Sequence, residues 1–216
     1  GQVRRSDSES NTSMRSIDTV RAERARLDAQ RIKALQSKID AMITENPRLN
    51  EYRSQIRIDV TPDGLQIQIV DDQNRPMFDS GSALVKPYMR DILPEIGAAL
   101  GGVENRISLA GHTDAAPYGN GDRGYSNWEL SADRANASRR ELVAGGMKEE
   151  KVLRVVGLSS AVLFDKADPY NPINRRISII VMNKRTEESI TKDAAIVEAG
   201  DEEEARSAMT EMGAGN

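Results

Sequence analysis

The sequence contains no cysteine and a single histidine, and these scarcities exclude several classes of site. Thiolate zinc sites, iron–sulfur clusters, disulfides and cysteine nucleophiles all need cysteine. Metal sites built from several imidazoles need more than one histidine. We therefore expect no metal and no cofactor. The compartment stays open, because a chain without cysteine is indifferent to redox conditions.

Aromatic residues and long apolar runs are scarce as well. Of the 216 residues, 4% are aromatic and 38% are hydrophobic, below the usual apolar share of a globular domain. One core is therefore expected to leave part of the chain outside it. No apolar run approaches the roughly 18 residues that cross a bilayer, and no signal peptide is recognisable. These residues predict a soluble protein, and any membrane anchor would lie outside them.

The net charge of -4 is unevenly distributed. Residues 1–50 hold ten Lys/Arg against seven Asp/Glu, whereas residues 186–216 hold two against nine. The middle of the chain is balanced, with eighteen of each sign. A nucleic-acid-binding domain needs a basic stripe, so we predict no nucleic-acid partner.

Composition divides the chain into four parts. Residues 1–13 are polar and rich in Ser and Asn, which predicts a disordered leader. Residues 14–50 are predicted to be a helical linker, and residues 51–185 a folded domain. Residues 186–216 are acidic and small, which predicts a disordered tail.

The linker helix is predicted over Met14–Thr44, which contains neither Gly nor Pro, and Asn46-Pro47 ends it. Its second half carries apolar residues with 3-4-3 spacing, which form a narrow stripe: Ile32, Leu35, Ile39 and Met42. Two interpretations remain open, a helix lying on the domain and a helix pairing with a second copy of the chain. The narrow stripe predicts weak docking.

The domain is predicted to follow the order β-β-α-β-α-β-β. Around a turn in which Gly64 supplies a positive φ, two alternating segments form a hairpin. Helices separated by strands predict an α/β (α+β) fold with the helices packed on a mixed sheet. The expected strands are Gln55–Val60, Leu65–Val70, Arg106–Gly111, Val152–Val156 and Ile177–Met182, and the expected helices are Ser82–Leu100, kinked at Pro94, and Asn127–Val143.

Two polar segments stand where a strand gives way to a loop and where a helix opens. They are Gly111-His112-Thr113-Asp114 and Asn127-x-x-Leu130-Ser131-x-x-Arg134-Ala135. If that strand and helix pack side by side, Asp114 and Arg134 flank one groove. This combination suits a zwitterion, because Asp pairs with an ammonium and the planar fork of Arg holds a carboxylate. From the residues alone, a direct pair between Asp114 and Arg134 is the more frequent outcome.

Together with Asn174-Arg175-Arg176 before the last strand, these segments resemble the OmpA-like peptidoglycan-binding family. The resemblance implies a non-enzymatic domain with a β/α/β/α/β sandwich that binds the peptide stem of peptidoglycan. It implies that Asp114 and Arg134 hold diaminopimelate, whose side chain ends in an amino acid group. The motifs place four further residues at this peptidoglycan-binding site: Thr113, Asn127, Leu130 and Arg176.

Thirteen positions lead from Asp114 to Asn127, more than in the outer-membrane members of the family. This insert, residues 115–125, resembles flagellar stator subunits of the MotB type, as do residues 87–93 and 152–157, so the similarity extends over residues 55–185. It implies the periplasmic domain of a single-pass inner-membrane protein. It also implies a homodimer, and a MotA-type partner reached through a transmembrane segment absent here. The insert is placed to fold over the groove.

Four functions compete: a stator anchor, an OmpA- or Pal-like anchor between wall and outer membrane, a wall hydrolase, and an assembly module without a ligand. The hydrolase would use His112, Asp114 and Ser131. A triad needs a nucleophile on a strained turn and an oxyanion hole, whereas Ser131 lies in a first helical turn, where we expect it to cap the helix. The resemblance favours the stator anchor.

Overall fold

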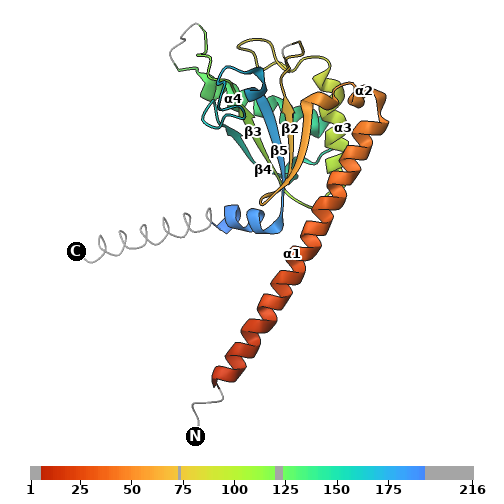
Figure 1. Cartoon of the computed structure of the whole chain (residues 1–216), viewed down its shortest axis with the longest axis vertical. Helices are drawn as coiled ribbons and strands as arrows, with labels where there is room; N and C mark the ends of the chain where they lie inside the picture. Colours follow the sequence, from red (N-terminus) through yellow and green to blue (C-terminus); the bar gives the residue numbers. More distant parts are fainter. Residues whose placement is uncertain (1–5, 73, 120–123, 193–216) are drawn as a thin grey trace, which may run out of the picture.

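The computed structural model describes residues 6–72, 74–119 and 124–192, and for residues 6–16 it describes the backbone alone. The strands and helices of the domain follow the predicted order β-β-α-β-α-β-β (Figure 1). The elements are α1 Ser6–Glu45, α2 Pro47–Asn50, β1 Ile56–Thr61, β2 Gly64–Val70, α3 Met89–Gly101, β3 Ile107–His112, α4 Asn127–Ala144, β4 Val152–Gly157 and β5 Arg176–Met182.

The five strands form one mixed sheet in the order β1-β2-β5-β3-β4. The pair β3–β4 is parallel, and the pairs β1–β2, β2–β5 and β3–β5 are antiparallel. The predicted hairpin is confirmed, with Gly64 at φ 139°. A Cβ on Gly64 would lie 2.0 Å from the carbonyl oxygen of Val181, so the close approach of the hairpin to β5 also requires glycine.

The two faces of the sheet differ in chemistry because side chains alternate along each strand. One face is apolar and packs against α3 and α4 in the core, where Ile67, Ile179 and Leu109 are fully buried. The other face carries polar partners, such as Gln66, whose amide donates to the Ser178 hydroxyl. α4 lies directly on β3, since a Cβ on Gly111 would come within 2.0 Å of the Ser131 carbonyl oxygen.

Helix α1 starts earlier than predicted, and its second half packs on the domain. It begins at Ser6, so residues 6–13 are helical where disorder was expected, and residues 1–5 lie outside the described part. Its second half joins the domain core through four buried residues: Ile32, Leu35, Ile39 and Ile43. Its first half projects from the domain, with Ile17 and Val20 about half exposed (Figure 1). The second half therefore lies on the domain, as in the first of the two interpretations, and the strength of this docking stays a prediction.

The segment before α3 is a loop where a helix was predicted. α3 begins at Met89 instead of Ser82, and Pro94 lies inside it. The loop closes on itself, because Phe78 and Val85 form an isolated bridge and the Lys86 amide donates to the Met77 carbonyl. Phe78 and Val85 are buried in this arrangement, so the loop contributes both side chains to the core.

The chain continues after β5 as a helix over residues 184–192 (Figure 1). Asn183 caps it, since its Oδ1 accepts from the amide of Thr186. Residues 186–192 are thus helical where disorder was expected, and residues 193–216 lie outside the described part. Within the described ranges, no helix is long and apolar enough to span a membrane.

Candidate ligand-binding site

Three charged residues lie together at one end of the sheet, where three neighbouring strands begin or end. Asp71 directly follows β2, Arg175 directly precedes β5, and Asp114 follows β3 by two residues. These three strands are neighbours and run alternately up and down, so their charged ends meet. The register shows this, because three residues at the strand ends pair across the sheet: Val70, Arg176 and His112.

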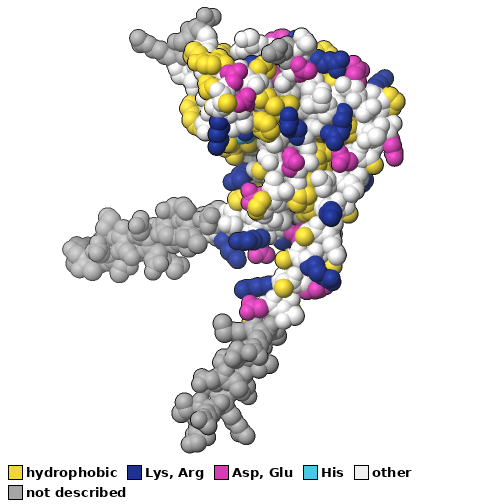
Figure 2. Space-filling model, viewed as in Figure 1, with side chains coloured by type: hydrophobic (Ala, Val, Ile, Leu, Met, Phe, Trp, Pro, Cys, Tyr) yellow, Lys and Arg dark blue, Asp and Glu magenta, His cyan; other side chains and the backbone are white. Residues whose placement is uncertain are grey.

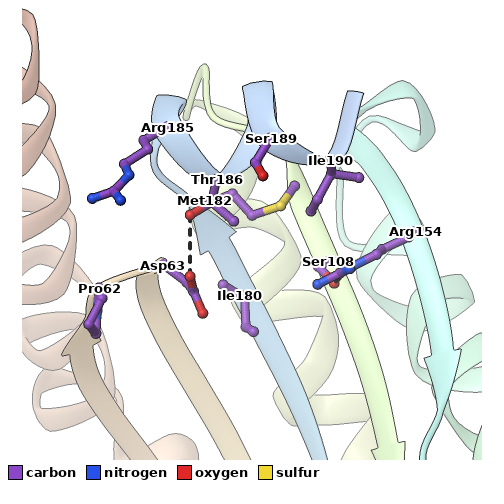
Figure 3. A pocket seen from close by; sticks show the side chains of 10 residues that line it. All are labelled: Pro62, Asp63, Ser108, Arg154, Ile180, Met182, Arg185, Thr186, Ser189 and Ile190. Carbon is purple, nitrogen blue, oxygen red and sulfur yellow. Dashed lines mark hydrogen bonds between the residues drawn. The ribbon is translucent and has the colours of Figure 1, made fainter. Parts of the chain in front are cut away.

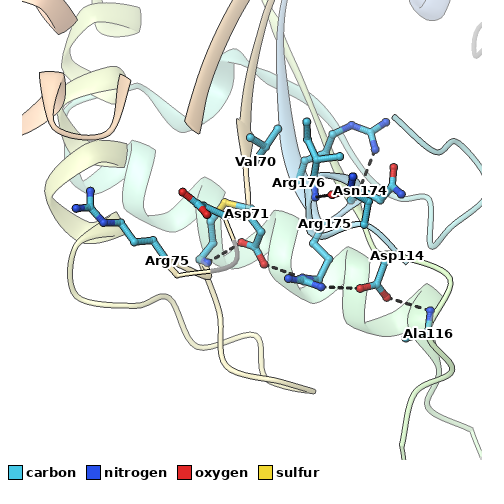
Figure 4. A network of polar contacts seen from close by, with 12 residues as sticks. Val70, Asp71, Arg75, Asp114, Ala116, Asn174, Arg175 and Arg176 are labelled. Carbon is cyan, nitrogen blue, oxygen red and sulfur yellow. Dashed lines mark hydrogen bonds and ion pairs between the residues drawn. The ribbon is translucent and has the colours of Figure 1, made fainter. Parts of the chain in front are cut away.

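Arg175 connects the two carboxylates (Figure 4). Its Nε donates to Asp71 Oδ2 over 2.8 Å, and its Nη1 donates to Asp114 Oδ2 over 2.7 Å. The second oxygen of each carboxylate accepts from a backbone amide, that of Met77 for Asp71 and that of Ala116 for Asp114. Both carboxylates are buried, with 7% and 8% of the two residues exposed.

Burial and ion pairing shift the pKa values of Asp71 and Arg175 in opposite directions. Burial raises the pKa of Asp71 and outweighs the hydrogen bonds from Arg175 and Met77, which lower it. Burial also disfavours the charged form of Arg175, but its hydrogen bonds to Asp71 and Asp114 prevail, so its pKa lies above the ordinary value. The guanidinium is therefore the fixed charge of the cluster.

Arg134 lies in the same cluster and forms no ion pair with any residue that the structure describes. Its Nε donates to the Ser82 carbonyl over 2.9 Å, and its Nη2 donates to the Asp79 carbonyl over 3.1 Å. Its guanidinium stands over the Phe78 ring, 4.9 Å from the centroid. The loop between β2 and α3 thus holds this arginine, and the direct pair with Asp114 that the residues alone favoured is not formed.

Burial and three charged neighbours affect the pKa of Arg134. Burial lowers the pKa of Arg134, the carboxylates of Asp71 and Asp114 raise it, and Arg175 lowers it. The cluster therefore contains two arginines and two aspartates whose charges balance. Such a set can exchange one internal contact for a zwitterionic ligand without leaving a net charge buried.

The other predicted site residues occupy different positions around this cluster. Thr113 is buried, and its amide donates to the Ser159 carbonyl. Asn127 ties the insert to α4, since its Nδ2 donates to the Ala116 carbonyl over 2.8 Å. Leu130 is buried in α4. The hydrogen bonds of Thr113 and Asn127 support the loop that carries Asp114.

Arg176 is not part of the cluster. Its Nε donates to the Gln68 side chain and its Nη2 to the Val162 carbonyl, on the polar face of the sheet. Figure 4 shows its side chain pointing away from Asp114. Because successive side chains of a strand alternate, Arg176 points to the other face, and Arg175 is the residue that contacts Asp114. The assignment of Arg176 to the ligand site stays a prediction.

The described parts of the insert contact both sides of the Arg134 region. The Tyr118 hydroxyl donates to the Gly81 carbonyl over 3.4 Å, and the Tyr125 hydroxyl donates to Asp133 over 2.7 Å. The two tyrosine rings contact each other, with centroids 5.1 Å apart. Residues 120–123 lie outside the described part, so the coverage of the groove by the insert stays a prediction.

The residues of a hydrolytic triad are not arranged as one. Ser131 is fully buried, its hydroxyl donates to the Trp128 carbonyl, and it accepts from the Ser159 amide. It does not cap the helix, because Ser126 does so in a capping box with Glu129. His112 is buried, and burial together with Arg176 lowers its pKa to about 4. An imidazole of this kind is a poor general base at neutral pH.

A separate groove of about 330 Å³ lies at the opposite end of the sheet, below the helix of residues 184–192 (Figure 3). It is lined by Asp63, Ser108, Arg154, Ile180, Met182 and Ile190, among others. The groove shares no residue with the charged cluster.

The fold and the charged cluster define a class of protein. Residues 77–176 match the model of the OmpA family. Motility protein B of Escherichia coli K12 is 52% identical to the chain over 170 residues, which are 79% of the chain and 55% of that protein. The chain therefore spans about half the length of this relative.

Solved structures agree on the fold. A MotB-like protein from Desulfovibrio vulgaris superimposes with a TM-score of 0.61 at 17% identity, covering 74% of this chain and 95% of the other. The cell wall anchor of the type VI secretion system (T6SS) from Pseudomonas aeruginosa superimposes with a TM-score of 0.50 at 26% identity, covering 61% and 90%. The OmpA-like fold predicted from the motifs is confirmed.

Proposed function

We propose that this chain binds peptidoglycan without cleaving it, and that the bound group is the amino acid end of diaminopimelate in the stem peptide. One observation carries the proposal. Asp114 and Arg134 lie in one balanced cluster, yet they are held by other groups and not by each other. Each keeps the charge that one half of a zwitterion needs.

The chemistry of the two residues assigns the two ends of the ligand. The ammonium pairs with Asp114, which already receives one N–H from Arg175. The carboxylate pairs with Arg134, whose Nε and Nη2 are fixed by the Ser82 and Asp79 carbonyls, respectively, so the fork is oriented before the ligand arrives. Thr113 and Asn127 hold the Asp114 loop in place.

The wider role follows from the relatives. Similarity to Motility protein B, and to a cell wall anchor at 26% identity, supports a domain that anchors a flagellar stator to the wall. The domain then belongs in the periplasm, as a homodimer tethered to the inner membrane beside a MotA-type subunit. An OmpA- or Pal-like outer-membrane anchor is the alternative, and the 52% identity to Motility protein B favours the stator.

Walls of two compositions test the ligand assignment. Diaminopimelate and lysine both offer an ammonium at the end of the third stem residue, but only diaminopimelate adds a carboxylate. Co-sedimentation with purified sacculi is expected to retain the protein on diaminopimelate-type walls and to lose it on lysine-type walls. Equal retention on both would overturn the assignment, since Arg134 would then have no partner on the ligand.

A further inference from the structure

Asp71 is a buried carboxylate to which the proposed ligand contacts assign no task. It follows the last residue of β2 and forms an ion pair with Arg175 of the cluster. Its second oxygen accepts from the amide of Met77 over 2.7 Å. Burying a carboxylate costs free energy, so its presence beside the site needs a reason.

The reason lies in how Arg175 divides its hydrogen bonds between Asp71 and Asp114. A guanidinium beside one carboxylate commonly forms two parallel bonds to it. Arg175 instead gives Nε to Asp71 and Nη1 to Asp114, over 2.8 Å and 2.7 Å. Asp114 therefore receives one N–H from the arginine in place of two.

We propose that Asp71 is a positioning residue that holds Arg175 in this shared arrangement and thereby keeps Asp114 open to the ammonium of a ligand. Without Asp71, Arg175 turns its fork onto Asp114, and the ligand has to displace a bidentate pair. The inference rests on the proposed function, because it concerns the same site.

Asp71 has a second connection, which a test has to separate from the first. Its bond to the Met77 amide fixes the start of the loop whose Asp79 and Ser82 carbonyls hold Arg134. A loss of binding on removing Asp71 could therefore come from a misplaced Arg134. The two explanations differ in what they predict for a double variant that also lacks Arg175.

The experiment is a calorimetric titration of a diaminopimelate-containing stem tripeptide into four variants: Asp71→Asn, Arg175→Gln, the double variant, and Asp114→Asn. The asparagine at 71 keeps the shape and an oxygen for the Met77 amide. We expect Asp71→Asn to weaken binding about tenfold, as for charged groups in direct contact. We expect the double variant to bind as tightly as Arg175→Gln, because Asp71 then has no arginine to hold.

Three outcomes overturn the inference. A double variant about tenfold weaker than Arg175→Gln would mean that Asp71 acts through the Met77 loop. A loss of binding in Arg175→Gln alone would make Arg175 a direct ligand contact. Wild-type affinity in Asp71→Asn, while Asp114→Asn binds weakly, would refute the role of Asp71 and leave the proposed function standing.

The fourth variant, Asp114→Asn, tests the proposed function separately from the role of Asp71. Wild-type affinity in Asp114→Asn would refute the ligand assignment itself, whatever Asp71 does. Thermal unfolding of all four variants checks that a weak binder is folded.

Discussion

Arg175 and Arg176 are neighbours in the sequence with tasks on different faces of the sheet. Arg175 joins two carboxylates in the charged cluster. Arg176 is buried on the polar face, where it donates to Gln68 and to the Val162 carbonyl and stands 5.9 Å from the Phe164 ring centroid. Burial lowers the pKa of Arg176 to about 10, but the side chain stays charged at neutral pH.

Arg176→Met is therefore expected to affect folding and to spare ligand binding. The change leaves the Val162 carbonyl and the Gln68 side chain without a donor, which costs about 1–3 kcal/mol of unfolding free energy. Urea unfolding measures this loss, and the titration with stem tripeptide is expected to give the wild-type affinity. A binding defect in a variant of unchanged stability would return Arg176 to the site.

His112 makes the stability of the domain depend on pH. Its pKa is lowered to about 4 by burial, whereas an exposed imidazole in the unfolded chain titrates near about 6.5. Between these values the unfolded chain binds more protons, so stability falls as the pH is lowered through this window. Wild type is expected to lose about 2 kcal/mol of unfolding free energy between about pH 7 and about pH 5.

His112→Gln is the control for this pH dependence of the unfolding free energy, because glutamine is polar but does not titrate. Urea unfolding of both proteins at the two pH values is the measurement. An equal loss in the variant would assign the slope to the carboxylates and not to His112.

At the scale of single residues, the motifs pointed to Asp114 and Arg134 but not to the groups that contact them. Asp71 carries no motif, and its place in the cluster follows only from the pairing of β2 with β5. The contact of Arg175 with Asp114 agrees with strand alternation, since Ile177 and Ile179 face the core and Arg176 therefore points to the other face. The carbonyls that hold Arg134 belong to a backbone conformation that side-chain patterns do not encode.

At the scale of elements, α1 has two halves with different environments. Ile39 is fully buried in the common core, whereas Val20 is 51% exposed on the projecting half. Ile39→Ala is expected to cost about 2–5 kcal/mol, because it leaves a cavity between α1 and the sheet. Val20→Ala is the matched control and is expected to change stability by about 0.5 kcal/mol or less. Similar losses in thermal unfolding for both would contradict this division of α1.

Element order was predictable because hydrophobic periodicity and turn residues agree over the domain. The hairpin around Gly64 and the helix Asn127–Ala144 are the clearest cases. The errors fall where apolar spacing has two structural meanings. Val85 lies inside the predicted helix Ser82–Leu100 but fills the core from a loop. Ile32, Leu35 and Ile39 of the narrow stripe are deeply buried against the domain, and Ile43 is buried with them in place of Met42, which helical periodicity alone does not reveal.

At the scale of the whole molecule, the charged cluster and the ends of the described chain lie apart. The projecting half of α1 and the helix of residues 184–192 leave from the end of the sheet opposite to the loops that carry Asp71 and Asp114 (Figure 1). An anchor tethered through α1 would thus present its ligand site away from the tether. On the face drawn in Figure 2, basic and acidic side chains are interspersed over the domain.

Turnover of the wall is not expected from this arrangement. Ser131 is buried with its hydroxyl engaged, and His112 is buried on the polar face of the sheet. Incubation of the protein with muropeptides from about pH 5 to about pH 9, followed by chromatography, is expected to show no new product. Cleavage that disappears in His112→Ala would contradict the non-catalytic account.

The most direct test of the central claim is the affinity of Asp114 and Arg134 variants for the diaminopimelate-containing stem tripeptide. Asp114→Asn and Arg134→Lys each change one half of the pair, the first by removing its charge and the second by removing its planar fork. The exposed residues Asp59 and Arg154, replaced by Ala, are the matched controls. The account predicts a loss of about 2–5 kcal/mol, at least about 30-fold, in each site variant, with wild-type affinity in both controls. Wild-type affinity in both site variants, with the fold intact, would contradict it.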